Sequence, residues 1–108
     1  MESLDIAPTL KGVFGDRLIP VRGHEYDGMN TQNFFLAGSD ETIDDAERTV
    51  RKFYIAHGLT QNHGSQSPSG LLRNLMFKSG EHSYCTAITA KLDENQSVTG
   101  VRITFVDI

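Results

Sequence analysis

The chain has 108 residues, a formal net charge of −4 at pH 7 and 38% apolar residues, which is typical of one soluble globular domain spanning 1–108. The acidic balance provides no electrostatic attraction for a phosphate backbone, so it argues against nucleic-acid binding. The single Cys85 excludes an internal disulfide and therefore a disulfide-stapled module, and no apolar run is long enough to span a bilayer.

The first third of the chain predicts little regular structure. Residues 1–12 carry few packing residues and one proline, and we expect a loosely ordered arm. The arm has no basic start followed by an apolar stretch, so no signal peptide is expected. The sequence leaves the compartment open between the cytoplasm and, if a leader has been removed, the periplasm. Residues 18–21 predict a short extended segment, which Pro20 confines to a sheet edge. Residues 23–28 are typical of a turn.

Residues 39–58 predict one central amphipathic helix. Ser39, Asp40 and Thr42 carry side-chain oxygens that can cap the first helical turn. Gly58 stands where a residue in the left-handed region would end the helix. The apolar positions recur at spacings of three and four and form one stripe for burial: Ile43, Ala46, Val50, Phe53 and Tyr54.

Four other segments predict β-strands, namely 31–37 before the helix and 71–78, 82–92 and 98–107 after it. The last has the cleanest alternation, with Val101, Ile103 and Phe105 facing inward. Residues 60–70 are rich in Gly, Ser and Asn and are predicted to form a mobile loop. These elements predict a two-layer α+β fold. Its antiparallel sheet consists of a three-stranded C-terminal meander plus at least one N-terminal strand, and one main helix covers it.

The same elements resemble two groups of known domains. The acidic helix start at Ser39 and Asp40, the helix end at Phe53, Tyr54 and Gly58, and the strands from residue 75 onward resemble small α+β domains of bacterial exported proteins and lipoproteins. Those families are mostly of unknown function, and this chain lacks their lipobox cysteine and export signal. The stretch AERTVRKFY also resembles the helix of NTF2-like domains, which normally begin with helices that this sequence does not predict. Both resemblances imply an architecture rather than an activity.

No pattern of residues predicts catalysis, a metal site or a cofactor. His82 and Cys85 are three apart on a predicted strand and therefore point to opposite faces. His57 with His63, and His24 beside Glu25, lack the spacing of structural zinc sites. Cys85 has no recognisable base, and neither a G-x-S-x-G elbow nor a phosphate-binding loop occurs. We therefore expect no catalytic, metal or cofactor residues, and the sequence leans against an enzyme without deciding the question.

Two functional hypotheses follow from the predicted fold. The first is a non-catalytic protein-interaction or structural module, with homodimer formation as its simplest version. The expected interaction surface lies on strands 31–37 and 71–78, which are apolar on both faces. Its residues are Phe34, Leu36, Leu72 and Met76. The alternative is a small-ligand or enzymatic pocket between helix and sheet, of NTF2-like type, lined by Tyr54, His57 and Tyr84. RNA binding on the sheet ranks last, because the charge is unfavourable and no RNP pattern occurs.

Overall fold

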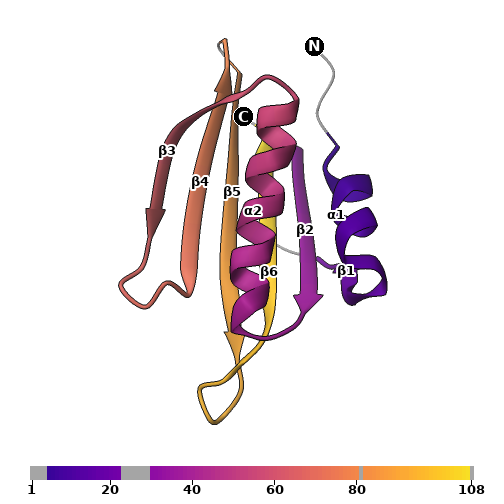
Figure 1. The fold of residues 1–108 in the computed structure, drawn as a ribbon, viewed down its shortest axis with the longest axis vertical. Helices are drawn as coiled ribbons and strands as arrows, with labels where there is room; N and C mark the ends of the chain where they lie inside the picture. Colours follow the sequence, from indigo (N-terminus) through magenta and orange to yellow (C-terminus); the bar gives the residue numbers. More distant parts are fainter. Residues whose placement is uncertain (1–4, 23–29, 81, 108) are drawn as a thin grey trace.

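The computed structural model describes residues 5–22, 30–80 and 82–107, and these form an α+β fold with two α-helices on one side of an antiparallel sheet (Figure 1). The predicted turn at 23–28 lies outside the described residues. The elements in chain order are α1 (Ala7–Phe14), a 3-10 turn η1 (Gly15–Arg17), β1 (Leu18–Pro20), β2 (Asn30–Ala37), α2 (Asp40–Ala56), β3 (Thr60–Gln66), β4 (Leu72–Ser79), β5 (His82–Leu92) and β6 (Val98–Asp107).

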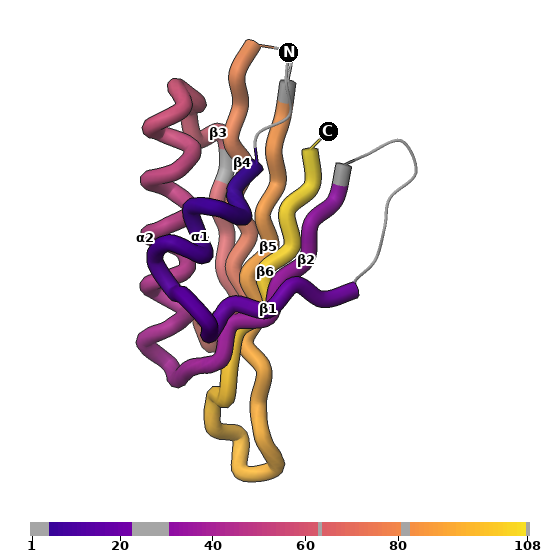
Figure 2. Tube along the Cα trace, turned by 90° about the vertical axis from the view of Figure 1, so that its right-hand side faces the viewer, coloured from indigo at the N-terminus to yellow at the C-terminus, as the bar shows by residue number. Residues whose placement is uncertain are grey.

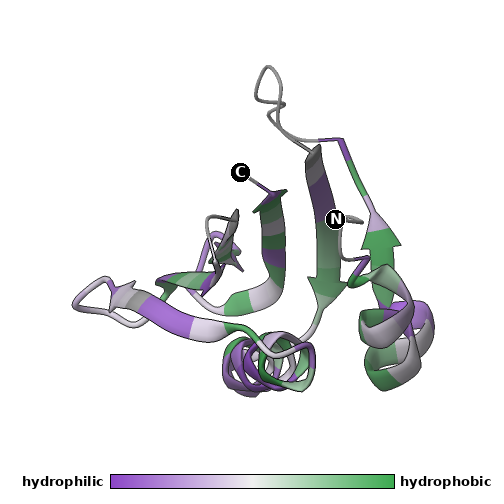
Figure 3. Ribbon diagram, turned by 90° about the horizontal axis from the view of Figure 1, so that it is seen from above, coloured by the Kyte–Doolittle hydropathy of each residue, from purple (hydrophilic) through white to green (hydrophobic). Residues whose placement is uncertain are grey.

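Within the described residues the sheet has six strands in the order β1-β2-β6-β5-β4-β3, and every neighbouring pair is antiparallel. It is therefore wider than the predicted three-stranded meander with an N-terminal strand, although β4, β5 and β6 do lie side by side. Seen along the strands, the sheet arcs around α2 (Figure 3). The other side of the sheet faces away from both helices (Figure 2). Two layers result, and only one face of the sheet is covered.

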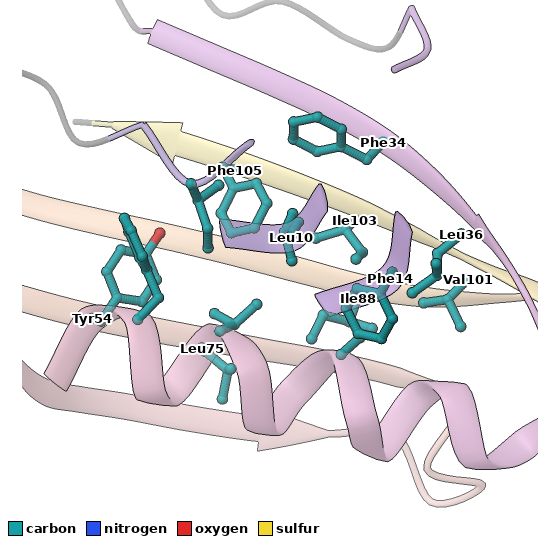
Figure 4. Packing of buried hydrophobic residues seen from close by; sticks show 14 of the residues in the cluster. Leu10, Phe14, Phe34, Leu36, Tyr54, Leu75, Ile88, Val101, Ile103 and Phe105 are labelled. Carbon is teal, nitrogen blue, oxygen red and sulfur yellow. The ribbon is translucent and has the colours of Figure 1, made fainter. Parts of the chain in front are cut away.

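The core lies between this covered face and the helices, and strand alternation explains its composition. Val101, Ile103 and Phe105 of β6 are buried as predicted, and Tyr84 and Ile88 of β5 face the same side. Side chains from β2 and β4 complete the layer (Figure 4). The largest fully buried apolar side chains are Phe77, Leu10, Leu36, Leu75, Ile88, Ile103, Val50 and Val101.

Helix α2 has the predicted stripe and the predicted end. Its stripe is buried at Ile43, Ala46, Val50, Phe53 and Tyr54. Gly58 follows the helix with φ of +80°, and its N–H donates to the carbonyl of Ile55, as expected for a left-handed residue after the last turn. Ser39 is the N-cap residue, but its side chain makes no capping hydrogen bond.

Two predictions for polar segments are wrong in the described chain. Residues 5–12 are not a loose arm, because Ala7–Phe14 form α1, with Pro8 in the first turn and Leu10 and Phe14 buried one helical turn apart. Residues 60–66 are not a loop, because they form β3 and pair with β4 through a bulge between Gln61 and His63. The cover of the sheet therefore consists of two helices instead of one.

Arg73 fastens α2 to the β3–β4 side of the sheet. Its side chain is only 14% exposed and lies 2.6 Å from a carboxylate oxygen of Asp44 and 3.7 Å from one of Glu47. Its Nε–H also donates to the carbonyl of Gly70 at 3.1 Å. One guanidinium thus links the middle of the helix, strand β4 and the turn that leads into it.

Candidate functional site

The uncovered face of the sheet, called the outer face below, carries apolar side chains in two rows across the strands. In the first, Val106, Cys85 and Met76 of β6, β5 and β4 stand directly opposite one another. The second has apolar ends and a polar middle. Ile19 of β1 stands opposite Phe35 of β2 at one end, and Leu72 of β4 stands at the other. Arg102 of β6 and Thr89 of β5 lie between them. Opposed residues of antiparallel strands point to the same face. An open antiparallel face is usually polar, so these two rows set the outer face apart.

The first row borders a shallow hollow of about 300 Å³. Besides Val106, Cys85 and Met76, its walls include Ala87 and Thr104. Burial raises the pKa of the Cys85 thiol, which keeps the thiol protonated and poorly nucleophilic at neutral pH. Cys85 therefore supplies no activated thiolate to the hollow.

The outer face is also free of carboxylates throughout the described strands. Its charged side chains there are cationic, with Arg102 in the second row and Lys78 and Lys91 near the strand ends. Arg102 donates to the carbonyl of Arg22 at 2.6 Å, so its charge is held against the chain that leaves β1. Helix α2, whose sequence is rich in acidic residues, lies on the opposite side of the sheet, as Figure 2 shows. The outer face is thus neutral to weakly basic on an acidic chain.

Tyr54 and Tyr84 fill the part of the interior between α2 and the sheet that surrounds them, whereas a polar cleft of about 260 Å³ lies between α2 and strands β3 and β4. The Tyr54 ring stacks on Phe77 with ring centres 4.7 Å apart and lies 5.7 Å from the Tyr84 ring. The hydroxyls of Tyr54 and Thr86 share a hydrogen bond of 3.2 Å, and burial raises the pKa of Tyr54 to about 12. The void that remains beside the two tyrosines measures about 20 Å³, which is room for one water molecule.

A larger cavity lies between the two helices, and we call it the helix groove. It measures about 560 Å³. Its apolar walls come from Val13 and Phe14 of α1 and from Phe53 and Ala56 of α2. The α2 residues that line the helix groove recur at spacings of three and four, so they share one side of the helix. This side borders the buried stripe and shares Phe53 with it. The residues are Asp45, Arg48, Thr49, Lys52, Phe53 and Ala56.

Three cations and one carboxylate line the helix groove. Arg17 lies over the Phe14 ring, with its guanidinium carbon 5.6 Å from the ring centre. Arg48 and Asp45 form an exposed ion pair at 3.1 Å. Lys52 has no ion-pair partner within 5–22, 30–80 and 82–107. The local charge is therefore positive, in contrast to the whole chain.

The residues predicted to carry function are distributed over three places. Phe34 and Leu36 are 5% and 0% exposed and lie in the core, so they offer no surface for a partner. Leu72 and Met76 do lie on the outer face, and Leu72 is 40% exposed. Tyr54 and Tyr84 are core residues.

His57 is separate from both tyrosines. It lines the helix groove, and its Nδ1 lies 2.9 Å from the carbonyl oxygen of Phe53. The helix groove was missed because α1 was not predicted. The signal was present in the spacing of Leu10 and Phe14, one turn apart after a proline in the first turn.

No family model, curated protein or solved structure matches this chain. In the described residues, no helix is long and apolar enough to cross a membrane. The same residues contain no group of three or more His, Cys, Asp or Glu side chains that could hold a metal ion. The functional argument therefore rests on the surfaces and cavities of the chain itself.

Proposed function

We propose that this chain is a non-catalytic interaction module that pairs with a second copy of itself through the outer face. The observation that carries the proposal is the apolar Val106–Cys85–Met76 row on a sheet face that neither helix covers, together with the apolar ends of the second row. Exposed Ile19 and Leu72, at 50% and 40%, stand at the two ends of the second row. An extended apolar area of this kind is characteristic of a surface that another protein covers.

Charge supports a second copy as the partner. The chain carries a net charge of −4, so two copies repel each other when their acidic sides approach. Helix α2, which carries many of the carboxylates, lies on the other side of the sheet, and the described strands place none on the outer face. Contact between two outer faces therefore avoids the repulsion that other approaches meet. A two-fold axis through the face would place each Val106–Cys85–Met76 row against its symmetry mate.

Close packing around Tyr54 and Tyr84 makes the alternative, a ligand pocket lined by these two side chains and His57, less favourable. Such pockets usually measure 300–1,000 Å³. The void beside Tyr54 and Tyr84 measures about 20 Å³. A ligand there would have to displace stacked aromatic side chains from the core, at a cost of several kcal/mol.

The test is the mass in solution of the intact chain and of two matched variants. The wild-type chain is expected to give twice 12.0 kDa by sedimentation equilibrium at micromolar concentration. Val106→Lys places like charges face to face at the centre of the contact, so it should give 12.0 kDa. Ile55→Lys is the control, because Ile55 is 63% exposed on α2 and should leave the mass doubled. A monomeric wild type, or equal behaviour of the two variants, contradicts the proposal.

A further inference from the structure

We infer that the helix groove is a binding site for a small anionic amphiphile, a single acidic head group on a flat apolar body. This site is separate from the outer face, since both helices lie on the other side of the sheet (Figure 2). Its volume of about 560 Å³ is within the range of small-molecule sites. The ligand class follows from the charges and from the rings that line it.

The charges of the groove select an anion. Arg17 reaches it from η1, the turn that follows α1, and Arg48 and Lys52 reach it from successive turns of α2. A ligand between the helices is therefore flanked by cations from both sides. Three cations against Asp45 alone, in a chain whose net charge is −4, is a local reversal of sign. Such a reversal attracts a negative group and repels a cation.

The cations are available to a ligand. Neither Lys52 nor Arg17 has an ion-pair partner in the described residues. The Arg17 guanidinium lies over the Phe14 ring. Arg48 is paired with Asp45, but the two side chains are 62% and 47% exposed. An exposed pair of this kind contributes little free energy, so an incoming acid can replace Asp45 as the partner of Arg48.

The apolar walls select the body of the ligand. Phe14 and Phe53 contribute rings from the two helices, and the His57 ring lies 4.4 Å from the Phe53 ring. The contact between His57 Nδ1 and the Phe53 carbonyl makes Nδ1 the protonated nitrogen in the neutral ring and fixes the ring beside Phe53. Val13 is 57% exposed, so an apolar partner gains by covering it. Ring-lined walls favour a flat aromatic body.

Two fluorescent probes that share nearly the same aromatic body, one with an acidic group and one without, test whether the groove selects the acidic head group. 1-Anilinonaphthalene-8-sulfonate carries an aromatic body and a sulfonate, and N-phenyl-1-naphthylamine has nearly the same body without the charge. We expect the sulfonate probe to bind the folded chain with one site per chain and at least tenfold more tightly than the neutral probe. Equal affinity for the two probes, or several weak sites per chain, would overturn the inference.

Three variants locate the site. Lys52→Glu and Val13→Asp should each weaken binding of the sulfonate probe about tenfold. The first reverses the charge of a side chain that attracts the sulfonate, and the second places a carboxylate on the apolar wall. Lys78→Glu is the matched control, because it makes the same change of net charge on β4, away from the groove. Circular dichroism of all three verifies folding, which these exposed positions should not disturb. If Lys78→Glu weakens the probe as much as Lys52→Glu does, the effect belongs to net charge and the groove is not the site.

Discussion

Arg73 shows how one side chain can tie together parts of the chain that the sequence keeps apart. Asp44 is 29 positions away, yet its carboxylate lies 2.6 Å from the Arg73 guanidinium. The exposed pair of Arg48 with Asp45 is local, at a spacing of three on one helix. Ion pairs with little solvent access contribute more than exposed ones, because water screens them less. The two arginines are therefore expected to differ in their effect on stability.

Substitution of each arginine by methionine, which keeps most of the apolar stem, measures this difference. Arg73→Met should lower the free energy of unfolding by about 1–3 kcal/mol, since charged hydrogen bonds to Asp44 and Gly70 are lost. Arg48→Met should change it by less than about 0.5 kcal/mol. Urea denaturation followed by circular dichroism gives both values. Equal losses would show that Arg73 does not fasten α2 to the sheet.

Tyr54 predicts a loss of stability in alkaline solution. Burial raises its pKa in the folded chain to about 12, above the ordinary value of 10.0. Between these two pH values the folded chain keeps the phenolic proton while the unfolded chain loses it. Stability from this group is therefore fully present below pH 10 and falls as the pH rises toward 12, by about 3 kcal/mol.

Urea denaturation at intervals of half a pH unit, from pH 8 to 12, tests this prediction. Tyr54→Phe removes the titrating hydroxyl and should flatten the fall above pH 10. At neutral pH the same variant should lose about 1 kcal/mol, because Thr86 loses its hydrogen-bond partner. An unchanged alkaline slope in Tyr54→Phe would assign the fall to other groups.

At the scale of elements, the sequence predicts the helices and strands whose spacing of apolar residues identifies them without any tertiary contact. Helix α2 and strand β6 each carry a complete stripe of inward residues, and both form where expected. Strand β3 carries no such pattern, because its side chains are polar. Its backbone hydrogen bonds to β4 define it, and tertiary pairing of this kind overrides a weak local preference.

The candidate sites follow the same rule. Met76 and Leu72 could be assigned to the outer face because strand alternation sets their direction. Phe34 and Leu36 could not, since β2 is apolar on both faces and only its register with β6 decides which side meets the core. The helix groove needs α1 and α2 together, and α1 is short and begins in a polar stretch. A site formed between two elements cannot be predicted when one of them is missed.

Substitution by alanine should have opposite effects on stability at two glycines, one after the end of a helix and one inside a helix. Gly58→Ala should lower the free energy of unfolding by about 1–2 kcal/mol, because the residue after α2 has φ of +80°. Gly12→Ala should raise it by up to about 1 kcal/mol, because Gly12 lies inside α1 and an added methyl group would contact nothing. Thermal unfolding of both variants measures the two shifts. No change in Gly12→Ala would mean that α1 contributes little to the folded state, and a loss of stability would contradict the open helical position of Gly12.

At the scale of the whole molecule, the two proposed surfaces lie on opposite sides of one sheet. The helix groove is built on α1 and α2, and the outer face is built on the strands (Figure 2). Binding at one surface can affect the other only if the two share a conformational change. The core between them is closely packed, with fully buried Phe77, Ile88 and Ile103, and closely packed side chains resist a change of shape. We therefore expect the two surfaces to act independently.

Val106→Lys should accordingly bind 1-anilinonaphthalene-8-sulfonate with the affinity of the wild-type chain, within about twofold, although it is monomeric. By reciprocity of coupling, the same probe at saturation should leave the dimer dissociation constant of the wild type unchanged. Fluorescence titration of the variant and sedimentation of the wild type with and without the probe check the two halves of the prediction. Loss of probe binding in Val106→Lys would place the probe on the outer face and remove the helix groove as its site. A shift of the dimer constant without that loss would show that the sheet transmits a change between its two sides.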